Sequence, residues 1–112
     1  MSGTTQSTIA ADAPVATLIN VFTVEPARQQ ALVDALSKAT VELFVELPGF
    51  VSANLHASLD GTAVINYAQW ESAGHFTAML ADPRAQQHMA EIMTIAATVE
   101  PRLTTVRAVH HA

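Results

Sequence analysis

The pattern of apolar positions divides the chain into four predicted strands and two predicted helices. Stretches rich in apolar and β-branched residues predict strands at residues 16–24, 50–58, 64–70 and 99–109. Between the first and second strands, and again between the third and fourth, apolar residues recur every three or four positions, which is typical of a helix with one buried face. The order along the chain is therefore β-α-β-β-α-β.

Proline, serine and aspartate mark the ends of the predicted helices. Pro26 lies in the first turn of the first helix, where its missing N–H is harmless, and Pro48-Gly49 ends that helix. The apolar face of this helix comprises Leu32, Leu36, Ala39, Leu43 and Leu47. Ser72 is suited to cap a short helix, and Asp82 to cap another directly after it. The second helix is thus predicted to be broken in two.

This order of elements predicts an α+β fold of the ferredoxin-like type, in which an antiparallel sheet carries its helices on one face. The opposite face of the sheet is expected to carry Val51, Ala53, Leu55, Ala57, Ile65 and Tyr67. Such a face is too apolar to meet water, and packing two sheets face to face would cover it. The sequence therefore predicts a homodimer.

Composition and charge exclude several classes of function. Of the 112 residues, 50% are apolar and 13% are charged, which predicts one globular domain at residues 15–110 after a flexible leader at residues 1–14. The net charge of −5 argues against nucleic acid or an anionic membrane as a partner. Cysteine is absent, which excludes thiolate catalysis and cysteine-ligated metals. With no secretory signal and no apolar stretch of membrane-spanning length, a cytoplasmic protein is expected.

The third predicted strand carries an amide and an indole on one face. Side chains alternate along a strand, so Asn66 and Trp70 point the same way as Val64 and Ala68. If that face is buried, both polar groups need partners, which could be protein groups, water or a polar substrate. Asn20 on the first strand is placed on the same side, because a lone amide there would meet the other two groups.

The register of the hairpin between the second and third strands decides where His56 lies. With a loop of residues 59–61 and Gly61 in the left-handed conformation, His56 lies opposite Val64 and faces the candidate site. With a two-residue turn of Asp60 and Gly61, it lies on the dimer face instead. The first register is preferred here. The broken helix would then cover the site with Phe76, Met79 and His88.

The segment at residues 56–72, HASLDGTAVINYAQWES, which follows LPGF at residues 47–50, resembles the antibiotic biosynthesis monooxygenase family. The resemblance extends over residues 16–110 and is strongest to the small quinone-forming members that act in aromatic polyketide pathways. It implies a dimeric α+β barrel with a pocket between sheet and helices in each subunit. It also implies insertion of one oxygen atom from O₂ into a phenolic polycycle without metal, flavin or haem. Carried over by position, it implies catalytic or substrate-orienting roles for Asn20, Asn66 and Trp70, and a pocket role for His56.

Such chemistry is possible without a cofactor, because a deprotonated anthrone-like phenol can itself pass an electron to O₂. The N–H donors of Asn66 and Trp70 would stabilise the developing oxyanion. An amide is not a base, so the proton would pass to His56, to His88 or to bound water. Phe76 stands where some relatives have a tyrosine, and an arginine further along the helix in some relatives has no clear match, so a hydroxyl donor and a cationic anchor for the substrate are not expected here.

Two other functions stay open. Haem-degrading monooxygenases also have an asparagine on the first strand and a histidine ligand on a helix, and Asn20 and His88 fall at these positions. Met79 replaces their helix tryptophan, however, and the chain has only five lysines and arginines with which to hold haem propionates. The third function is that of a dimeric module that binds a small molecule or serves in a stress response, because a fold alone does not fix chemistry.

Overall fold

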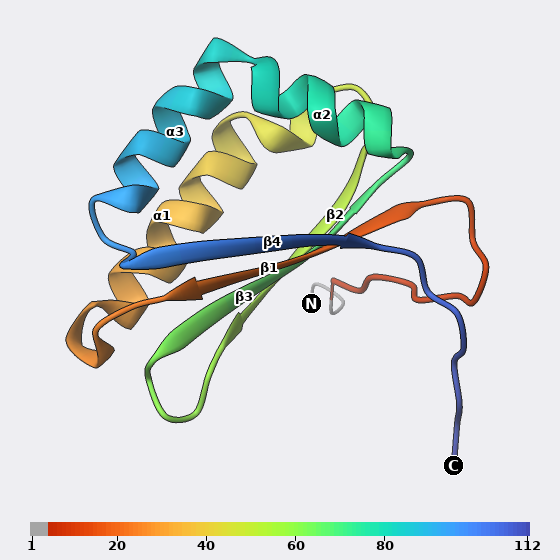
Figure 1. Cartoon of the computed structure of the whole chain (residues 1–112), viewed down its shortest axis with the longest axis horizontal. Helices are drawn as coiled ribbons and strands as arrows, with labels where there is room; N and C mark the ends of the chain where they lie inside the picture. The colour runs from red at the N-terminus through yellow and green to blue at the C-terminus, as the bar shows by residue number, and fades with distance from the viewer. Residues whose placement is uncertain (1–4) are drawn as a thin grey trace.

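The computed structural model describes residues 5–112 and shows four strands and three α-helices (Figure 1). In chain order the elements are β1 (Ala16–Thr23), α1 (Gln29–Glu42), β2 (Phe50–Ala57), β3 (Ala63–Trp70), α2 (Ala73–Ala81), α3 (Pro83–Met93) and β4 (Thr98–Thr104). The strands form one sheet in the order β2-β3-β1-β4, and every neighbouring pair is antiparallel. The predicted α+β, ferredoxin-like architecture with a broken second helix is confirmed.

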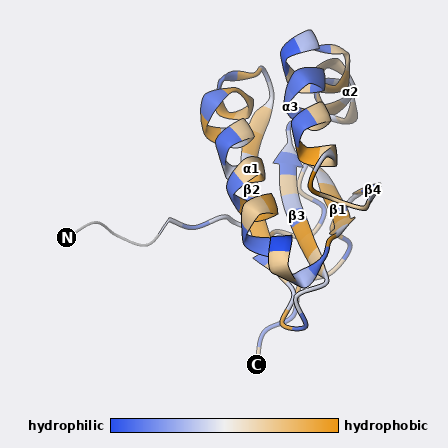
Figure 2. Cartoon of the chain, turned by 90° about the vertical axis from the view of Figure 1, so that its left-hand side faces the viewer, coloured by the Kyte–Doolittle hydropathy of each residue, from blue (hydrophilic) through white to orange (hydrophobic). Residues whose placement is uncertain are grey.

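All three helices cover the same face of the sheet, as Figure 1 shows, and the core lies between these two layers. In Figure 2, α1 and α3 each carry both hydrophilic and hydrophobic residues, as amphipathic helices do. The most completely buried side chains of the core include Phe22, Leu32, Val64 and Ile92, each at most 1% exposed. Phe22 and Val64 are directly opposite each other on β1 and β3, so the alternation along both strands sets the core face.

The helix boundaries follow the predicted capping residues at α2 and α3. The Ser72 hydroxyl accepts a hydrogen bond from the backbone N–H of His75 at 3.2 Å, and the Asp82 carboxylate accepts one from Arg84 at 2.8 Å. The first helix differs from the prediction. A 3-10 turn at Pro26–Arg28 precedes α1. Helix α1 ends at Glu42, and a second 3-10 turn at Phe44–Glu46 follows it and brings Phe44 into the core.

The preferred hairpin register is wrong, and the alternative register is the one observed. His56 lies opposite Ile65, and Ala57 lies opposite Val64. Hydrogen bonds between the backbones of Ser58 and Ala63 (3.0 Å) and of Gly61 and Ser58 (3.1 Å) close a loop of residues 59–62. His56 therefore lies on the face away from the helices. For the same reason Ala53, Leu55 and Ala57 lie on the helix-facing side, opposite to their predicted placement.

Side chains of the loop explain this register. The Asp60 carboxylate accepts hydrogen bonds from the backbone N–H and the hydroxyl of Thr62, at 3.0 and 2.7 Å, and from the hydroxyl of Ser58 at 2.8 Å. These hydrogen bonds lower the pKa of Asp60 to about 2. The Ser58 hydroxyl also accepts a hydrogen bond from the backbone N–H of Ala63 at 2.9 Å. At the other end of β2, an irregularity between Phe50 and Ser52 leaves Val51 without a partner on β3.

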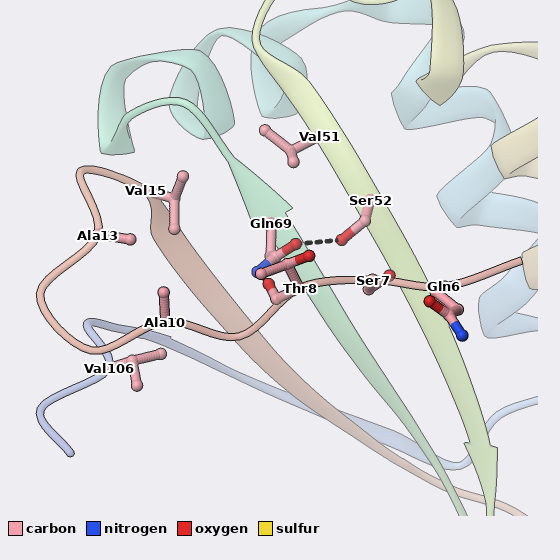
Figure 3. Close-up of a pocket in the computed structure, with 10 residues that line it drawn as sticks. All are labelled: Gln6, Ser7, Thr8, Ala10, Ala13, Val15, Val51, Ser52, Gln69 and Val106. Atoms are coloured by element: carbon pink, nitrogen blue, oxygen red, sulfur yellow. Dashed lines mark hydrogen bonds between the residues drawn. The ribbon is translucent and has the colours of Figure 1, made fainter. Parts of the chain in front are cut away.

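The outer face of the sheet carries no helix, and residues 5–15 lie across part of it. The backbone carbonyl of Thr8 accepts a hydrogen bond from Gln69 at 2.8 Å, and Ser7 donates one to Asn54 at 2.7 Å. This segment and the sheet together line a hollow of about 390 Å³. Figure 3 shows Gln69 and Ser52, which line it from the sheet, hydrogen-bonded to each other. The first four residues of the predicted leader lie outside the described residues, and the division at residue 15 stays a prediction.

The last strand is shorter than predicted. β4 ends at Thr104, and the chain beyond it leaves the sheet, where the carbonyl of Val106 accepts a hydrogen bond from Asp12 at 2.9 Å. Pro101 lies within β4, which is an edge strand, so its missing N–H is tolerated. No helix within residues 5–112 has the length and apolar character needed to cross a membrane.

Candidate active site

An apolar cavity of about 190 Å³ lies between the sheet and the helices. The sheet lines it with Leu18, Asn20 and Phe22 of β1, Asn66 of β3, and Val99 and Pro101 of β4. The helical layer lines it with Leu36 of α1, Phe44 of the second 3-10 turn, Phe76, Met79 and Leu80 of α2, and Met89 of α3. No side chain in this lining ionises. Among residues 5–112, the only hydrogen-bonding side chains that line it are the two carboxamides, Asn20 and Asn66.

The two carboxamides form a cross-strand pair. Asn20 and Asn66 are directly opposite each other on β1 and β3, as the sequence predicted. The side-chain oxygen of each is buried and has no hydrogen-bond partner among residues 5–112. A buried polar atom without a partner costs about 1–3 kcal/mol. Asparagine is also disfavoured in strands, so two of them at one register position point to a polar ligand in the cavity.

Trp70 shares the helix-facing side of β3 with Asn66 but is absent from the cavity lining. It is 2% exposed, and its ring packs edge-on against Phe50 at 5.4 Å and against Phe76 at 6.5 Å between ring centroids. Phe76 in turn lines the cavity. The structure therefore puts Trp70 behind the wall of the cavity, where it holds Phe76, and a direct catalytic role for it stays a prediction.

Helix α2 supplies three of the side chains that line the cavity. Phe76, Met79 and Leu80 are spaced by three and four positions, so they point to the same side of the helix. The Ser72 cap fixes where the helix begins and hence which side chains face inward. Leu80 is 49% exposed, so it lies at the outer edge of the cavity. The predicted cavity positions of Phe76 and Met79 agree with this geometry.

The two candidate histidines lie away from the cavity. His56 is exposed on the outer face of the sheet, with its Nδ1 atom 3.1 Å from the backbone carbonyl oxygen of Asn54. His88 is half-buried on α3 and does not line the cavity. At about 100° per residue, His88 and Met89 lie on either side of the buried stripe of α3 formed by Ala85 and Ile92, and Met89 is the one that lines the cavity. The expected contributions of these two histidines to the site are therefore corrected.

The position of His88 also bears on the haem-degrading alternative, which depended on a helical histidine facing the cavity. Among residues 5–112, no histidine lines this cavity. The structure therefore does not place the histidine ligand that this alternative needs.

Several lining residues were not among the sequence candidates. Leu18 and Phe22 could have been found, because they alternate with Asn20 along the same strand. Leu36 belongs to the predicted apolar face of the first helix. Pro101 carried no such signal, because its position opposite Asn20 depends on the pairing of two strands far apart in the sequence.

Comparison with known proteins identifies the family. Residues 16–91 match the family model described as antibiotic biosynthesis monooxygenase. Tetracenomycin-F1 monooxygenase from Streptomyces glaucescens is 50% identical over 82 residues, which cover 73% of this chain and 73% of that protein.

Solved structures agree with this match. The monooxygenase from the gene ActVA-Orf6 of Streptomyces coelicolor, in complex with the ligand nanaomycin D, has a TM-score of 0.79 and 34% identity, over 87% of this chain and 91% of that chain. SnoaB, a cofactor-independent oxygenase from Streptomyces nogalater, has a TM-score of 0.72 and 29% identity, over 87% of this chain and 97% of that chain. The chain belongs to the antibiotic biosynthesis monooxygenase family.

Proposed function

We propose that this chain inserts one oxygen atom from O₂ into a phenolic, anthrone-type polycyclic substrate to give a quinone, without a metal, flavin or haem. The chain is an oxidoreductase of the monooxygenase type. The names of its relatives support the finer statement, since one acts on tetracenomycin F1 and another is described as cofactor-independent. The observation that carries the proposal is the pair of carboxamides in an otherwise apolar cavity, whose side-chain oxygens have no hydrogen-bond partner among residues 5–112.

The carboxamides of Asn20 and Asn66 are suited to hold the oxygen-bearing edge of the substrate. Each can rotate to present its NH₂ group to a phenolate or enolate oxygen. As the substrate loses its proton, negative charge develops on that oxygen in a site from which apolar walls exclude water. Removing one such donor from an oxyanion site typically costs about 10²–10³ in turnover.

The oxygen chemistry is balanced by the substrate alone. The substrate anion passes one electron to O₂, and the resulting radical and superoxide combine into a carbon-bound hydroperoxide. Loss of water from the hydroperoxide leaves the carbonyl of the quinone. Overall, one CH₂ group and one O₂ become one C=O group and one water. The protein binds, orients and desolvates the substrate in this sequence of steps.

The proton of the substrate passes to water in this proposal, because none of the side chains that line the cavity ionises. The pH dependence of turnover should then follow the acidity of the substrate.

The cavity must widen to admit a polycyclic substrate. Its volume of about 190 Å³ is below the range of about 300–1,000 Å³ that is usual for sites of drug-sized ligands. Helix α2 is the element best suited to move, since it contributes three lining side chains and contains no fully buried residue. Leu80 at the outer edge would be displaced first.

Oxygen consumption tests the proposal. Purified, chelator-treated protein is supplied with an anthrone such as dithranol, beside Asn66→Ala and a control without enzyme. Uptake well above the spontaneous rate, and lost in the variant, is the expected result. Uptake equal to the control would refute the proposed reaction on this class of substrate.

A homodimer and a cytoplasmic location are part of the same proposal. The outer face of the sheet presents Ile19, Val21, Ile65 and Tyr67, and Val51 beside them is 47% exposed. Residues 5–15 cover only part of this face, so a second sheet would bury more apolar surface. Light scattering at micromolar concentration should give twice the chain mass of 11.9 kDa. A single-chain mass would refute the dimer.

A further inference from the structure

Two thioethers line the cavity in which oxygen is proposed to react. Met79 of α2 and Met89 of α3 are both half-buried and both border the cavity that the two carboxamides face. Met93 lies one helical turn after Met89 on α3, is 37% exposed and does not line the cavity. The chain thus contains a built-in comparison between methionines inside and outside the site.

Thioethers are the groups in this lining that a hydroperoxide can oxidise. The other lining residues are aliphatic, phenylalanine, proline or carboxamide side chains, which a hydroperoxide does not attack under mild conditions. Methionine is converted to its sulfoxide by transfer of one oxygen atom to sulfur. An intermediate formed beside Met79 and Met89 would therefore have these two sulfurs as its competing acceptors.

We propose that Met79 and Met89 are sites of self-modification during turnover, each accepting an oxygen atom from the substrate hydroperoxide. This inference rests on the proposed function, which supplies the hydroperoxide. In the step, the O–O bond breaks, the distal oxygen bonds to sulfur, and the substrate keeps the proximal oxygen as an alcohol. Sulfur is oxidised by two electrons and the peroxide is reduced by two, so no further reactant is needed.

The modification inactivates the site. A sulfoxide is polar, so it introduces an oxygen acceptor into a wall that otherwise presents carbon and sulfur to the substrate. That acceptor competes with the substrate oxygen for the NH₂ groups of Asn20 and Asn66. Activity should therefore fall in proportion to the number of turnovers completed rather than to the time of incubation.

Peptide mass spectrometry after turnover tests the inference. The protein is cycled with dithranol and O₂ in the presence of catalase and a chelator, and the sulfoxide at each methionine is quantified against oxygen consumed. The expected result is that Met79 and Met89 are oxidised several-fold more than Met93. Hydrogen peroxide added without substrate should give the reverse order, because Met93 is the more exposed. Asn66→Ala, which turns over slowly, should lose the preference.

Each outcome has one meaning. Sulfoxide at Met93 equal to or above that at the cavity methionines overturns the inference, and so does normal oxygen uptake without any sulfoxide. In both cases the proposed function stands. Oxygen uptake no greater than the control without enzyme refutes the proposed function, and the inference falls with it.

Leucine variants give an independent measurement, because methionine and leucine have similar volumes and exchange with little loss of stability. Met79→Leu combined with Met89→Leu is compared with Met93→Leu, and every protein is normalised to its own initial rate. The double variant should lose activity per turnover several-fold more slowly than the wild type, whereas Met93→Leu should match the wild type. Equal rates of inactivation in all three proteins would overturn the inference.

Discussion

Replacing Asn66 by alanine should affect turnover and stability in different ways. The side-chain oxygen of Asn66 is buried without a partner among the described residues, so the folded protein gains no hydrogen bond from it. Removing it relieves a cost of about 1–3 kcal/mol, which offsets the packing lost with the side chain. We therefore expect the free energy of unfolding to change by no more than about 1 kcal/mol, or roughly 4–8 °C in Tm.

The same substitution removes a donor from the developing oxyanion. The expected cost is about 2.7–4 kcal/mol of transition-state stabilisation, which corresponds to a fall in kcat of about 10²–10³. A fall of about tenfold is the smallest effect that fits the proposal. Oxygen uptake and thermal unfolding are measured on the same preparation. An unchanged kcat in a folded variant would remove Asn66 from the mechanism. A large loss of stability would refute the reasoning that its amide lacks a partner in the folded chain.

Asn54→Ala is the matched control. Asn54 lies on the outer face of the same sheet, and its NH₂ group donates to the backbone carbonyl of Tyr67 at 2.9 Å. Its removal should lower the free energy of unfolding by about 0.5–1.5 kcal/mol and leave kcat unchanged. Asn66→Ala should therefore lower kcat with little change in stability, whereas Asn54→Ala should lower stability with no change in kcat.

Three further predictions concern other residues and pH. Trp70→Phe should lower Tm, because its ring supports Phe50 and Phe76, and a kcat that falls with unchanged Tm would instead favour a donor role. Asp60 has its pKa lowered from 3.8 to about 2, so it stabilises the hairpin above pH ~4 and ceases to do so as the pH falls to ~2; the Thr62 amide shift in NMR should report this titration. The pH profile of kcat should move with the phenol pKa of the substrate, and one profile shared by substrates of different acidity would contradict the assignment of water as proton acceptor.

Local signals in the sequence were sufficient for the fold and for the centre of the site. The alternation along β3 put Asn66 beside Val64 on one face, and Asn20 was placed on the same side because its amide would meet Asn66 there. The caps at Ser72 and Asp82 located α2 and α3. These features depend on neighbours in the chain, on side-chain alternation and on helix capping. Each is readable from a few residues.

The errors arose where a feature depended on contacts made by individual loop or strand residues. The hairpin register depended on hydrogen bonds from the loop backbone to the hydroxyl of Ser58 and the carboxylate of Asp60, and a shift of one position moves His56 from one face of the sheet to the other. The rotation of α3 about its axis likewise decides that Met89, and not His88, lines the cavity. Pro101 reaches the cavity only through the pairing of β1 with β4, which no local pattern reveals.

In the proposed dimer, residues 5–15 and a second sheet compete for one surface. The segment is hydrogen-bonded to the outer face through Thr8 and Ser7, and as a tethered competitor it acts at an effective concentration of roughly millimolar order. If the second sheet contacts the part of the face that the segment covers, both copies must release their segments first, and the apparent dissociation constant then rises with the inverse square of the open fraction. A segment that is open one time in ten would weaken dimerisation roughly a hundredfold. A purification tag placed ahead of β1 would therefore change the apparent dissociation constant of the proposed dimer.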